Sequence, residues 1–205
     1  MIPDSRSDGI SGRHSLLFLG YGITDRLAVE AEAAVITAKQ FKAGDDPSGM
    51  PSRIEESGLG DVESQLRWRW AEENESRPEI FSYYETVFPL QKDKLLIGTS
   101  DWELKFGTGV VKGYSWGTIT LRLAGEYSRD EQKFDLGEYA VEYLRRVNDK
   151  FRFYIGAEGN QDELELINDL QFHIFPNGFI RINNSFGATS KATDWAPEVG
   201  ILFYF

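Results

Sequence analysis

The chain ends in Gly200-Ile201-Leu202-Phe203-Tyr204-Phe205, a stretch that alternates bulky apolar side chains and closes on an aromatic ring. Val199, Ile201, Phe203 and Phe205 occupy every second position, so they share one face of an extended strand. A final strand with one apolar face and a terminal Phe is typical of bacterial outer-membrane β-barrels, in which that face meets lipid. This stretch therefore predicts a transmembrane β-barrel.

The same period of two recurs upstream. Between residues 27 and 35 every second residue is apolar, and the residues between them include Glu30 and Glu32. Segments 15–24 and 79–88 are apolar on both faces, so their orientation stays open. The other alternating segments are 61–70, 118–127, 138–143, 151–158 and 164–174.

Length and composition agree with this fold. With 205 residues, the chain can form one barrel of about ten to twelve strands at roughly 18 residues per strand and connection. No apolar run reaches the roughly 18 residues of a transmembrane helix. The mean hydropathy of −0.39 does not exclude a barrel, because its two faces average out. The net charge of −11 argues against nucleic acid as a partner.

Short turns alternate with longer links along the chain, and residues 39–57 form the longest link. Outer-membrane barrels show the same alternation, between short periplasmic turns and longer extracellular loops. Tryptophans fall only at expected strand ends, as in the aromatic girdles of membrane barrels. They are Trp68, Trp70 and Trp116 at the periplasmic end and Trp102 and Trp195 at the other. We predict an all-β, antiparallel up-and-down transmembrane β-barrel of about 11–12 strands.

The sequence divides into a polar N-terminal segment, residues 1–13, and a single barrel, residues 14–205. With both termini in the periplasm, segment 14–24 runs toward the periplasm, so an oppositely directed strand must precede it. Residues 1–13 are too short and polar for that strand, and they lack the pattern of a signal peptide. We therefore expect about eleven strands here, with the signal peptide and a twelfth strand upstream.

Two short motifs carry a family resemblance. Residues 21–27 (YGITDRL) and 58–62 (GLGDV) resemble the outer-membrane proteins associated with the meta-pathway of phenol degradation, and residues 87–90 and Phe205 do so more loosely. The resemblance implies a barrel of twelve or a similar number of strands and a channel for small, often hydrophobic compounds. No substrate-binding residue carries over from these motifs.

The alternation places charged side chains on the inner face, where they would line the lumen. They either bias a water-filled path toward cations or neutral solutes, or form cross-strand ion pairs that fill the barrel. The candidates are Glu63, Arg67, Arg69, Arg122, Glu126, Glu142, Arg152, Glu158, Glu165, Asp169, Arg181 and Glu198.

The patterns and the resemblance together predict a passive outer-membrane channel or transporter for small molecules. The resemblance implies that hydrophobic or aromatic compounds are among them. We expect a monomer in contact with outer-membrane lipid, delivered by the barrel-assembly machinery through Phe205. Two alternatives remain. A soluble or periplasmic barrel that binds an apolar ligand would show the same alternation with its faces reversed. A structural barrel with a plugged lumen is the other.

No catalytic, cofactor or metal site is predicted, so we do not expect an enzyme. His14 and Ser15 are neighbours in a strand and point to opposite faces, and His173 has no nearby Ser. The chain has no Cys and only these two His. The Gly44-Asp45-Asp46 motif suits a solvated loop better than a calcium site.

Overall fold

The computed structural model describes residues 2–3, 11–42, 49, 51–99, 101–129 and 132–205. Their regular structure is a single sheet of strands, and no helix among them is long and apolar enough to span a membrane. The strands are β1 (Ile2–Pro3), β2 (Ser11–Gly22), β3 (Leu27–Phe41), β4 (Arg53–Ala71), β5 (Glu79–Phe88), β6 (Glu103–Tyr114), β7 (Gly117–Ser128), β8 (Lys133–Arg146), β9 (Phe151–Gly159), β10 (Leu164–Phe175), β11 (Gly178–Gly187) and β12 (Ala196–Phe203).

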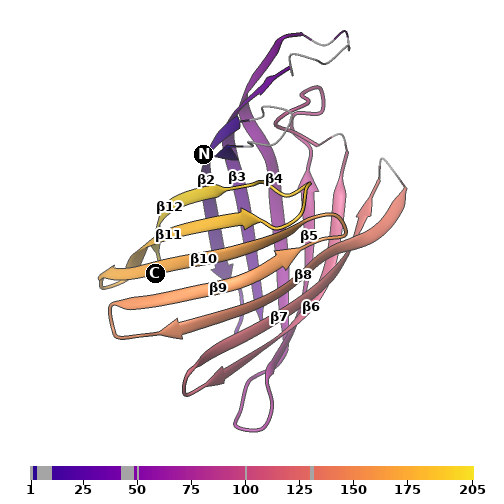
Figure 1. Cartoon of the computed structure of the whole chain (residues 1–205). Helices are drawn as coiled ribbons and strands as arrows, with labels where there is room; N and C mark the ends of the chain where they lie inside the picture. Colours follow the sequence, from indigo (N-terminus) through magenta and orange to yellow (C-terminus); the bar gives the residue numbers. More distant parts are fainter. Residues whose placement is uncertain (1, 4–10, 43–48, 50, 100, 130–131) are drawn as a thin grey trace.

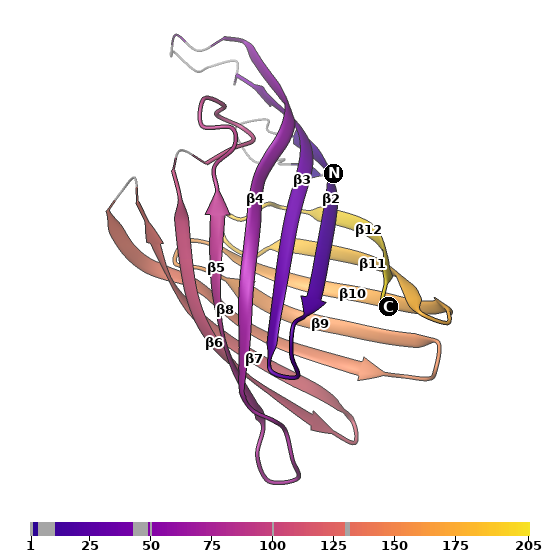
Figure 2. The same ribbon diagram turned by 180° about the vertical axis from the view of Figure 1, so that it is seen from behind.

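Each strand pairs in antiparallel fashion with the next strand along the chain, from β1 to β12. The sheet curls, so that β2 to β4 lie opposite β9 to β12 across a concave interior (Figures 1 and 2). The prediction of an all-β, up-and-down antiparallel barrel fold is confirmed, with eleven long strands and the two-residue β1.

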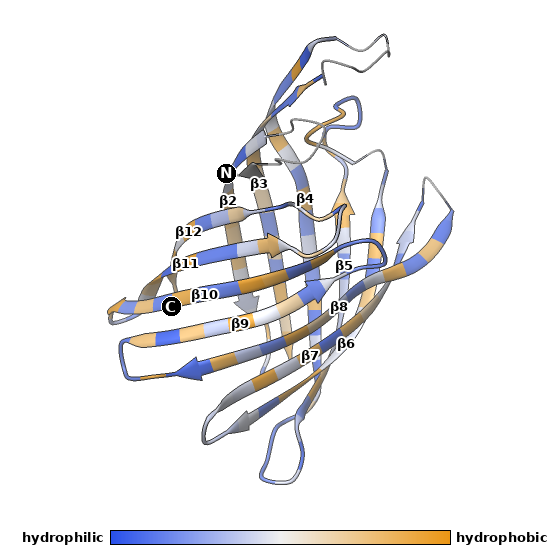
Figure 3. Cartoon of the chain, in the orientation of Figure 1, coloured by the Kyte–Doolittle hydropathy of each residue, from blue (hydrophilic) through white to orange (hydrophobic). Residues whose placement is uncertain are grey.

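Alternation along each strand separates two faces, visible as alternating bands on β8 to β12 (Figure 3). The concave face carries most of the charged side chains and the best-buried aromatic rings, Phe81 and Tyr83, each 2% exposed. On β7 to β10, the convex face exposes apolar side chains by 43–56%. These side chains are Leu121, Leu123, Val141, Ile155 and Leu166.

Side-chain oxygens close several of the turns. Thr24 Oγ1 accepts hydrogen bonds from the Arg26 and Leu27 amides, at 3.2 and 3.0 Å, between β2 and β3. Asn148 and Asn160 do the same for the amides two and three residues further on. Such local bonds favour reversal over continuation of the strand. Between β10 and β11 the hairpin is tight, because Phe175 pairs with Gly178 across a two-residue link.

The link between β3 and β4 differs from the sequence-based expectation. Residues 39–57 were predicted as a loop, but β3 continues to Phe41 and β4 begins at Arg53. The prediction was wrong at these bounds because the hairpin ladder extends to the pair Phe41 and Arg53, with Lys39 Nζ 3.0 Å from Glu55 Oε1. Asp45 and Asp46 lie outside the described residues.

Candidate functional site

The interior is organised in rows that run across the strands. One row joins Tyr83 on β5, Gly107 on β6, Ala124 on β7 and Glu138 on β8, each paired with the next. Because Gly107 and Ala124 are small, the Tyr83 ring lies across them, and its hydroxyl donates to Glu138 Oε2 at 2.8 Å. A hydrogen bond thus spans four strands inside the curled sheet.

In the neighbouring row, a small residue likewise lets a long side chain, here that of Arg122, reach past the adjacent strand. It runs from Phe81 through Gly109, Arg122 and Ala140 to Glu158. Arg122 reaches across Ala140, which is 2% exposed, and its Nη2 lies 3.1 Å from Glu158 Oε2. Small residues in the middle of each row therefore let long side chains meet from strands that are not adjacent.

Arg122 holds three carboxylates. Its Nη1 lies 2.6 Å from Glu138 Oε1, and its Nη2 lies 2.6 Å from Glu142 Oε1 in addition to the contact with Glu158. We call Tyr83, Arg122, Glu138, Glu142 and Glu158 the Arg122 cluster. Charge-assisted bonds from a guanidinium to carboxylates are among the strongest polar contacts in proteins, so this cluster stiffens the middle of the wall.

Two smaller ion pairs lie on the same face. Lys105 Nζ is 2.8 Å from Glu85 Oε1, and Gln65 donates to the other oxygen of Glu85 at 2.9 Å. Further along the sheet, Arg181 on β11 lies 3.3 Å from Asp169 on β10. Asp169 is 3% exposed, so Arg181 compensates a buried charge.

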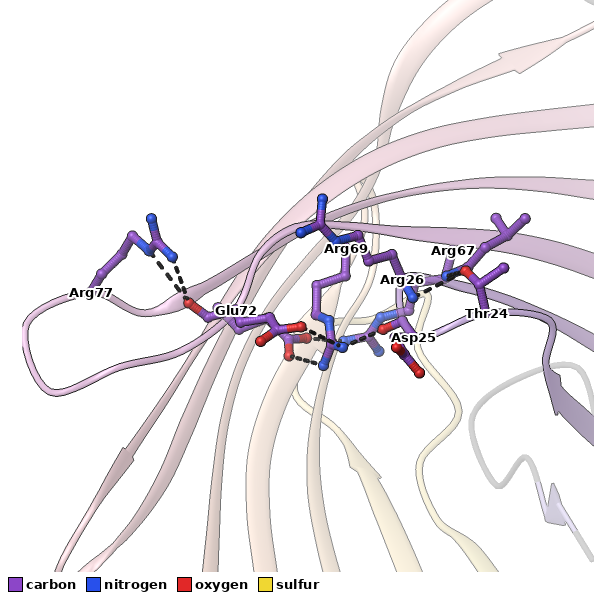
Figure 4. A network of polar contacts seen from close by, with 9 residues as sticks. Thr24, Asp25, Arg26, Arg67, Arg69, Glu72 and Arg77 are labelled. Atoms are coloured by element: carbon purple, nitrogen blue, oxygen red, sulfur yellow. Dashed lines mark hydrogen bonds and ion pairs between the residues drawn. The ribbon is translucent and has the colours of Figure 1, made fainter.

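Two arginines near the end of β4 form a separate network. Arg67 Nη2 lies 3.1 Å from Glu79 Oε1, and its guanidinium stands 3.8 Å above the Phe81 ring. Arg69 contacts Glu72 at 3.2 Å and also donates to the Asp25 carbonyl in the β2–β3 turn, so it ties two connections together (Figure 4).

On the concave face of β3, β4 and β6, carboxylates lie opposite one another instead of opposite a cation. Glu32 pairs directly with Glu63, and the same row continues through Val87 to Glu103. We call Glu32, Glu63 and Glu103 the acidic row. None of the three forms an ion pair with any residue that the structure describes. Glu32 and Glu63 line a small hollow beside the Phe18 ring.

The remaining predicted lumen residues have fewer polar contacts. Glu126 pairs in register with Lys105, and Glu198 accepts a hydrogen bond from Asn183 at 3.3 Å. Glu165 accepts one from the Ser185 hydroxyl. Arg152 has no ion-pair partner within the described part of the chain. The predicted set therefore separates into clustered, singly bonded and unpaired members.

Sequence reasoning missed the contribution of β5. Segment 79–88 could not be oriented, yet it supplies Phe81, Tyr83 and Glu85 to the interior. A signal for this was present in Gly107 and Gly109, two glycines at strand spacing that leave room for the rings opposite them.

The histidines form no reactive grouping. His173 packs against Phe179, with ring centroids 4.9 Å apart, and His14 pairs with Ile36 in the β2–β3 ladder. In the part of the chain that the structure describes, no group of three or more His, Asp or Glu side chains is arranged to hold a metal ion.

No protein-family model matches the sequence, and no curated protein matches it. Among solved structures, an outer membrane channel from Pseudomonas putida F1 is similar, with a TM-score of 0.67 and 14% sequence identity. The match covers 95% of this chain and 82% of that chain. At this identity the similarity establishes the fold. The resemblance to proteins of phenol degradation is therefore supported by no family model and no curated sequence.

Proposed function

We propose that the chain forms an outer-membrane β-barrel through which small solutes diffuse passively, with cations favoured over anions. The acidic row carries this proposal, because Glu32, Glu63 and Glu103 face the interior without a paired cation among the described residues. Uncompensated carboxylates along a water-filled path attract cations and repel anions. The fold similarity to an outer membrane channel supports the same reading.

Aromatic side chains support a membrane location in the bacterial outer membrane. Trp68 and Trp70 are 40% and 62% exposed near the end of β4. Trp102 and Trp195 directly precede β6 and β12. Indole rings prefer the boundary between hydrocarbon and headgroups, so these positions suit the two interfaces of a monomer embedded in lipid. Phe205 is fully exposed and accessible to the barrel-assembly machinery.

The solute class rests on the sequence resemblance, which implies small and often hydrophobic or aromatic compounds. A structural barrel with a plugged lumen is the second candidate. The Arg122 cluster favours it, because a guanidinium held by three carboxylates fills space that a solute would need. The two candidates differ in whether the barrel conducts.

Reversal potentials in planar bilayers under a salt gradient test the proposal. The unmodified protein should prefer cations, and the preference should weaken at high salt as the charges are screened. The triple variant Glu32→Gln, Glu63→Gln, Glu103→Gln should shift toward anions. The charge-matched control neutralises the connections instead, through Glu75→Gln, Asp93→Asn and Asp149→Asn, and should keep the cation preference.

A protein that conducts in neither form would contradict the passive channel. In that case, uptake of phenol into liposomes that contain the protein decides between a transporter for apolar compounds and a plugged structural barrel.

A pair of adjacent substitutions tests which face meets lipid. Leu166→Arg, on the convex face, should cost about 2–4 kcal/mol of unfolding free energy in bilayers, whereas Glu165→Arg on the concave face should cost about 1 kcal/mol or less. Reversible unfolding in lipid vesicles measures both. A soluble barrel that binds an apolar ligand predicts the opposite order.

A further inference from the structure

Three arginines share one row across the sheet, at the end that carries the β8–β9 and β10–β11 turns. Arg146, the last residue of β8, lies directly opposite Arg152 on β9. The row continues from Arg152 through Gln171 on β10 to Arg181 on β11. Gln171 and Arg181 both contact the inward-facing Asp169, so this row lies on the concave face. We call Arg146, Arg152, Gln171 and Arg181 the basic row.

The charge of this region is opposite to that of the whole chain. The chain has a net charge of −11, but segments 145–152 and 171–181 hold a single acid, Asp149, and five cations. The cations are Arg145, Arg146, Lys150, Arg152 and Arg181. A local excess of positive charge in a concave surface attracts anions. The basic row therefore has the sign that suits an anionic ligand.

Acids of the protein compensate only part of the basic row. Arg181 Nη2 lies 3.3 Å from Asp169 Oδ2. Arg146 Nη2 lies 2.6 Å from Asp149 in the β8–β9 turn, where the two side chains are 59% and 95% exposed. An ion pair that is this exposed contributes little to stability. Arg152 has no ion-pair partner among the residues that the structure describes.

The direct opposition of Arg146 and Arg152 needs a physical explanation. Side chains directly opposite on antiparallel strands have Cβ atoms about 4.5–5.5 Å apart, and like charges at such positions are destabilising. An oxyanion held between the two side chains would replace this repulsion by two attractions. A guanidinium presents its N–H groups in a planar fork that matches the oxygens of a carboxylate or a phosphate. Two such forks on neighbouring strands therefore favour a bound oxyanion.

Two buried polar atoms beside the basic row also lack partners. Arg181 Nε and His173 Nε2 are buried and form no hydrogen bond within the described part of the chain. The His173 ring packs against Phe179, two residues before Arg181, with ring centroids 4.9 Å apart. The main-chain amide of His173 donates to the Lys150 carbonyl at 2.8 Å, which places it beside the β8–β9 turn. Buried polar atoms are nearly always hydrogen-bonded, so these two atoms indicate a site for a polar ligand.

We propose that the basic row binds a small free oxyanion, a solute with a phosphate or carboxylate group, between Arg146 and Arg152 and beside Arg181. The concave position favours a free solute over a lipid headgroup, because lipid surrounds the convex face in the proposed function. The site requires no conductance. A barrel that conducts nothing would therefore count against the proposed function and not against this site.

Calorimetric titration of the full chain in a non-ionic detergent tests the site, with inorganic phosphate and acetate as separate probes at constant ionic strength in chloride. At least one probe should bind saturably. Arg146→Met and Arg152→Met should each weaken this binding about tenfold or more, because each removes a charge-assisted contact. The matched control is Arg145→Met, which removes the same charge one residue away, on the convex face opposite Phe153. Its affinity should change by about twofold or less, because salt screens the more distant charge.

Thermal unfolding separates a loss of binding from a loss of the fold. In the absence of both probes, Arg152→Met should unfold close to the temperature of the unmodified protein, because it loses no ion pair with a described residue. A ligand that binds only the folded state raises the unfolding temperature. The bound probe should therefore stabilise the unmodified protein and Arg145→Met, but not Arg152→Met.

Three results would overturn the proposal. Equal losses of affinity in the three variants would show an effect of net charge alone. Absence of saturable binding by both probes would leave the basic row without an oxyanion ligand. Stabilisation by phosphatidylglycerol vesicles that is lost in Arg152→Met, with no effect of either free probe, would show that the row contacts a lipid headgroup instead of a free solute.

Discussion

The Arg122 cluster and the acidic row lie on the same concave face and draw on the same residue types, but they are opposite in electrostatic design. In the cluster, one guanidinium lies within 3.1 Å of three carboxylates and a tyrosine hydroxyl completes the network. In the acidic row, Glu32 and Glu63 are directly opposed, and no cation among the described residues pairs with them.

The difference shows that the pairing register between strands, rather than the alternation within one strand, decides whether a carboxylate meets a cation. Glu63 and Glu142 both sit in alternating strands and both face inward. Glu142 meets a cation because the neighbouring strand brings Arg122 to it, whereas the register of β3 brings Glu32 to Glu63. One region therefore acts as a brace, and in the proposed function the other lines a charged path.

The largest effect is expected from removing the cation of the cluster. Arg122→Met leaves three carboxylates close together without compensation, so the unfolding free energy should fall by about 2–4 kcal/mol, discounted for partial solvent access. Urea unfolding in lipid vesicles measures the loss. The control Arg152→Met removes an inward arginine without an ion-pair partner in the described residues and should cost about 1 kcal/mol or less. Equal losses would remove the distinction between brace and path.

A second test crowds the rows. A Cβ at Gly107 would collide with the Tyr83 ring, so Gly107→Ala should cost about 1–3 kcal/mol and displace the hydroxyl from Glu138. At Gly20, which pairs with Glu30 near the acidic row, the nearest atom to a Cβ is Phe18 Cε1 at 3.5 Å. Gly20→Ala should therefore be close to neutral. Thermal unfolding of both variants measures the two costs. A Gly107→Ala variant as stable as the unmodified protein would contradict the packing of the Tyr83 ring across Gly107.

Neutralising one carboxylate in each region should change stability in opposite directions. Glu63→Gln relieves a direct cross-strand repulsion and should stabilise the protein by about 0.2–1 kcal/mol. Glu142→Gln weakens a charge-assisted contact with Arg122 and should destabilise it by about 1 kcal/mol. Denaturant midpoints at a pH above neutrality measure both. A loss of stability in Glu63→Gln would indicate that the acidic row has a cation partner in solution.

The smallest effect is expected outside the wall, in the β4–β5 connection. The Gly113 amide donates to Glu73 at 2.8 Å, and with Lys112 nearby it lowers the pKa of the Glu73 carboxyl below its ordinary value of 4.5. A lowered pKa in the folded protein stabilises it above the unfolded value, and this contribution is lost as the pH falls through the folded value. Glu73→Gln should therefore be less stable than the unmodified protein at about pH 7, and the difference should shrink as the pH falls below 4.5. A gap between the two proteins that widens in acid would contradict this assignment.

Much of the fold could be predicted because it depends on local pattern. Alternation in segments such as 118–127 and 164–174 predicted both strands and faces, and Asn148 and Asn160 stand where reversals occur. Segment 79–88 could not be oriented, since both of its faces are apolar. Its role in the interior depends on Gly107 and Gly109 in another strand.

The sequence by itself determined where most of the strands lie and, in the alternating ones, which residues share a face, because side chains in an extended chain point alternately to opposite sides. It also determined the excess of acidic groups. Only the tertiary structure decided which face is concave and which acids meet a cation. Those outcomes depend on the register between strands, including the shift in the β3–β4 ladder between Ala33 and Val35, and on small residues that let side chains cross a row. Pairing between distant segments sets both, and no local signal specifies it.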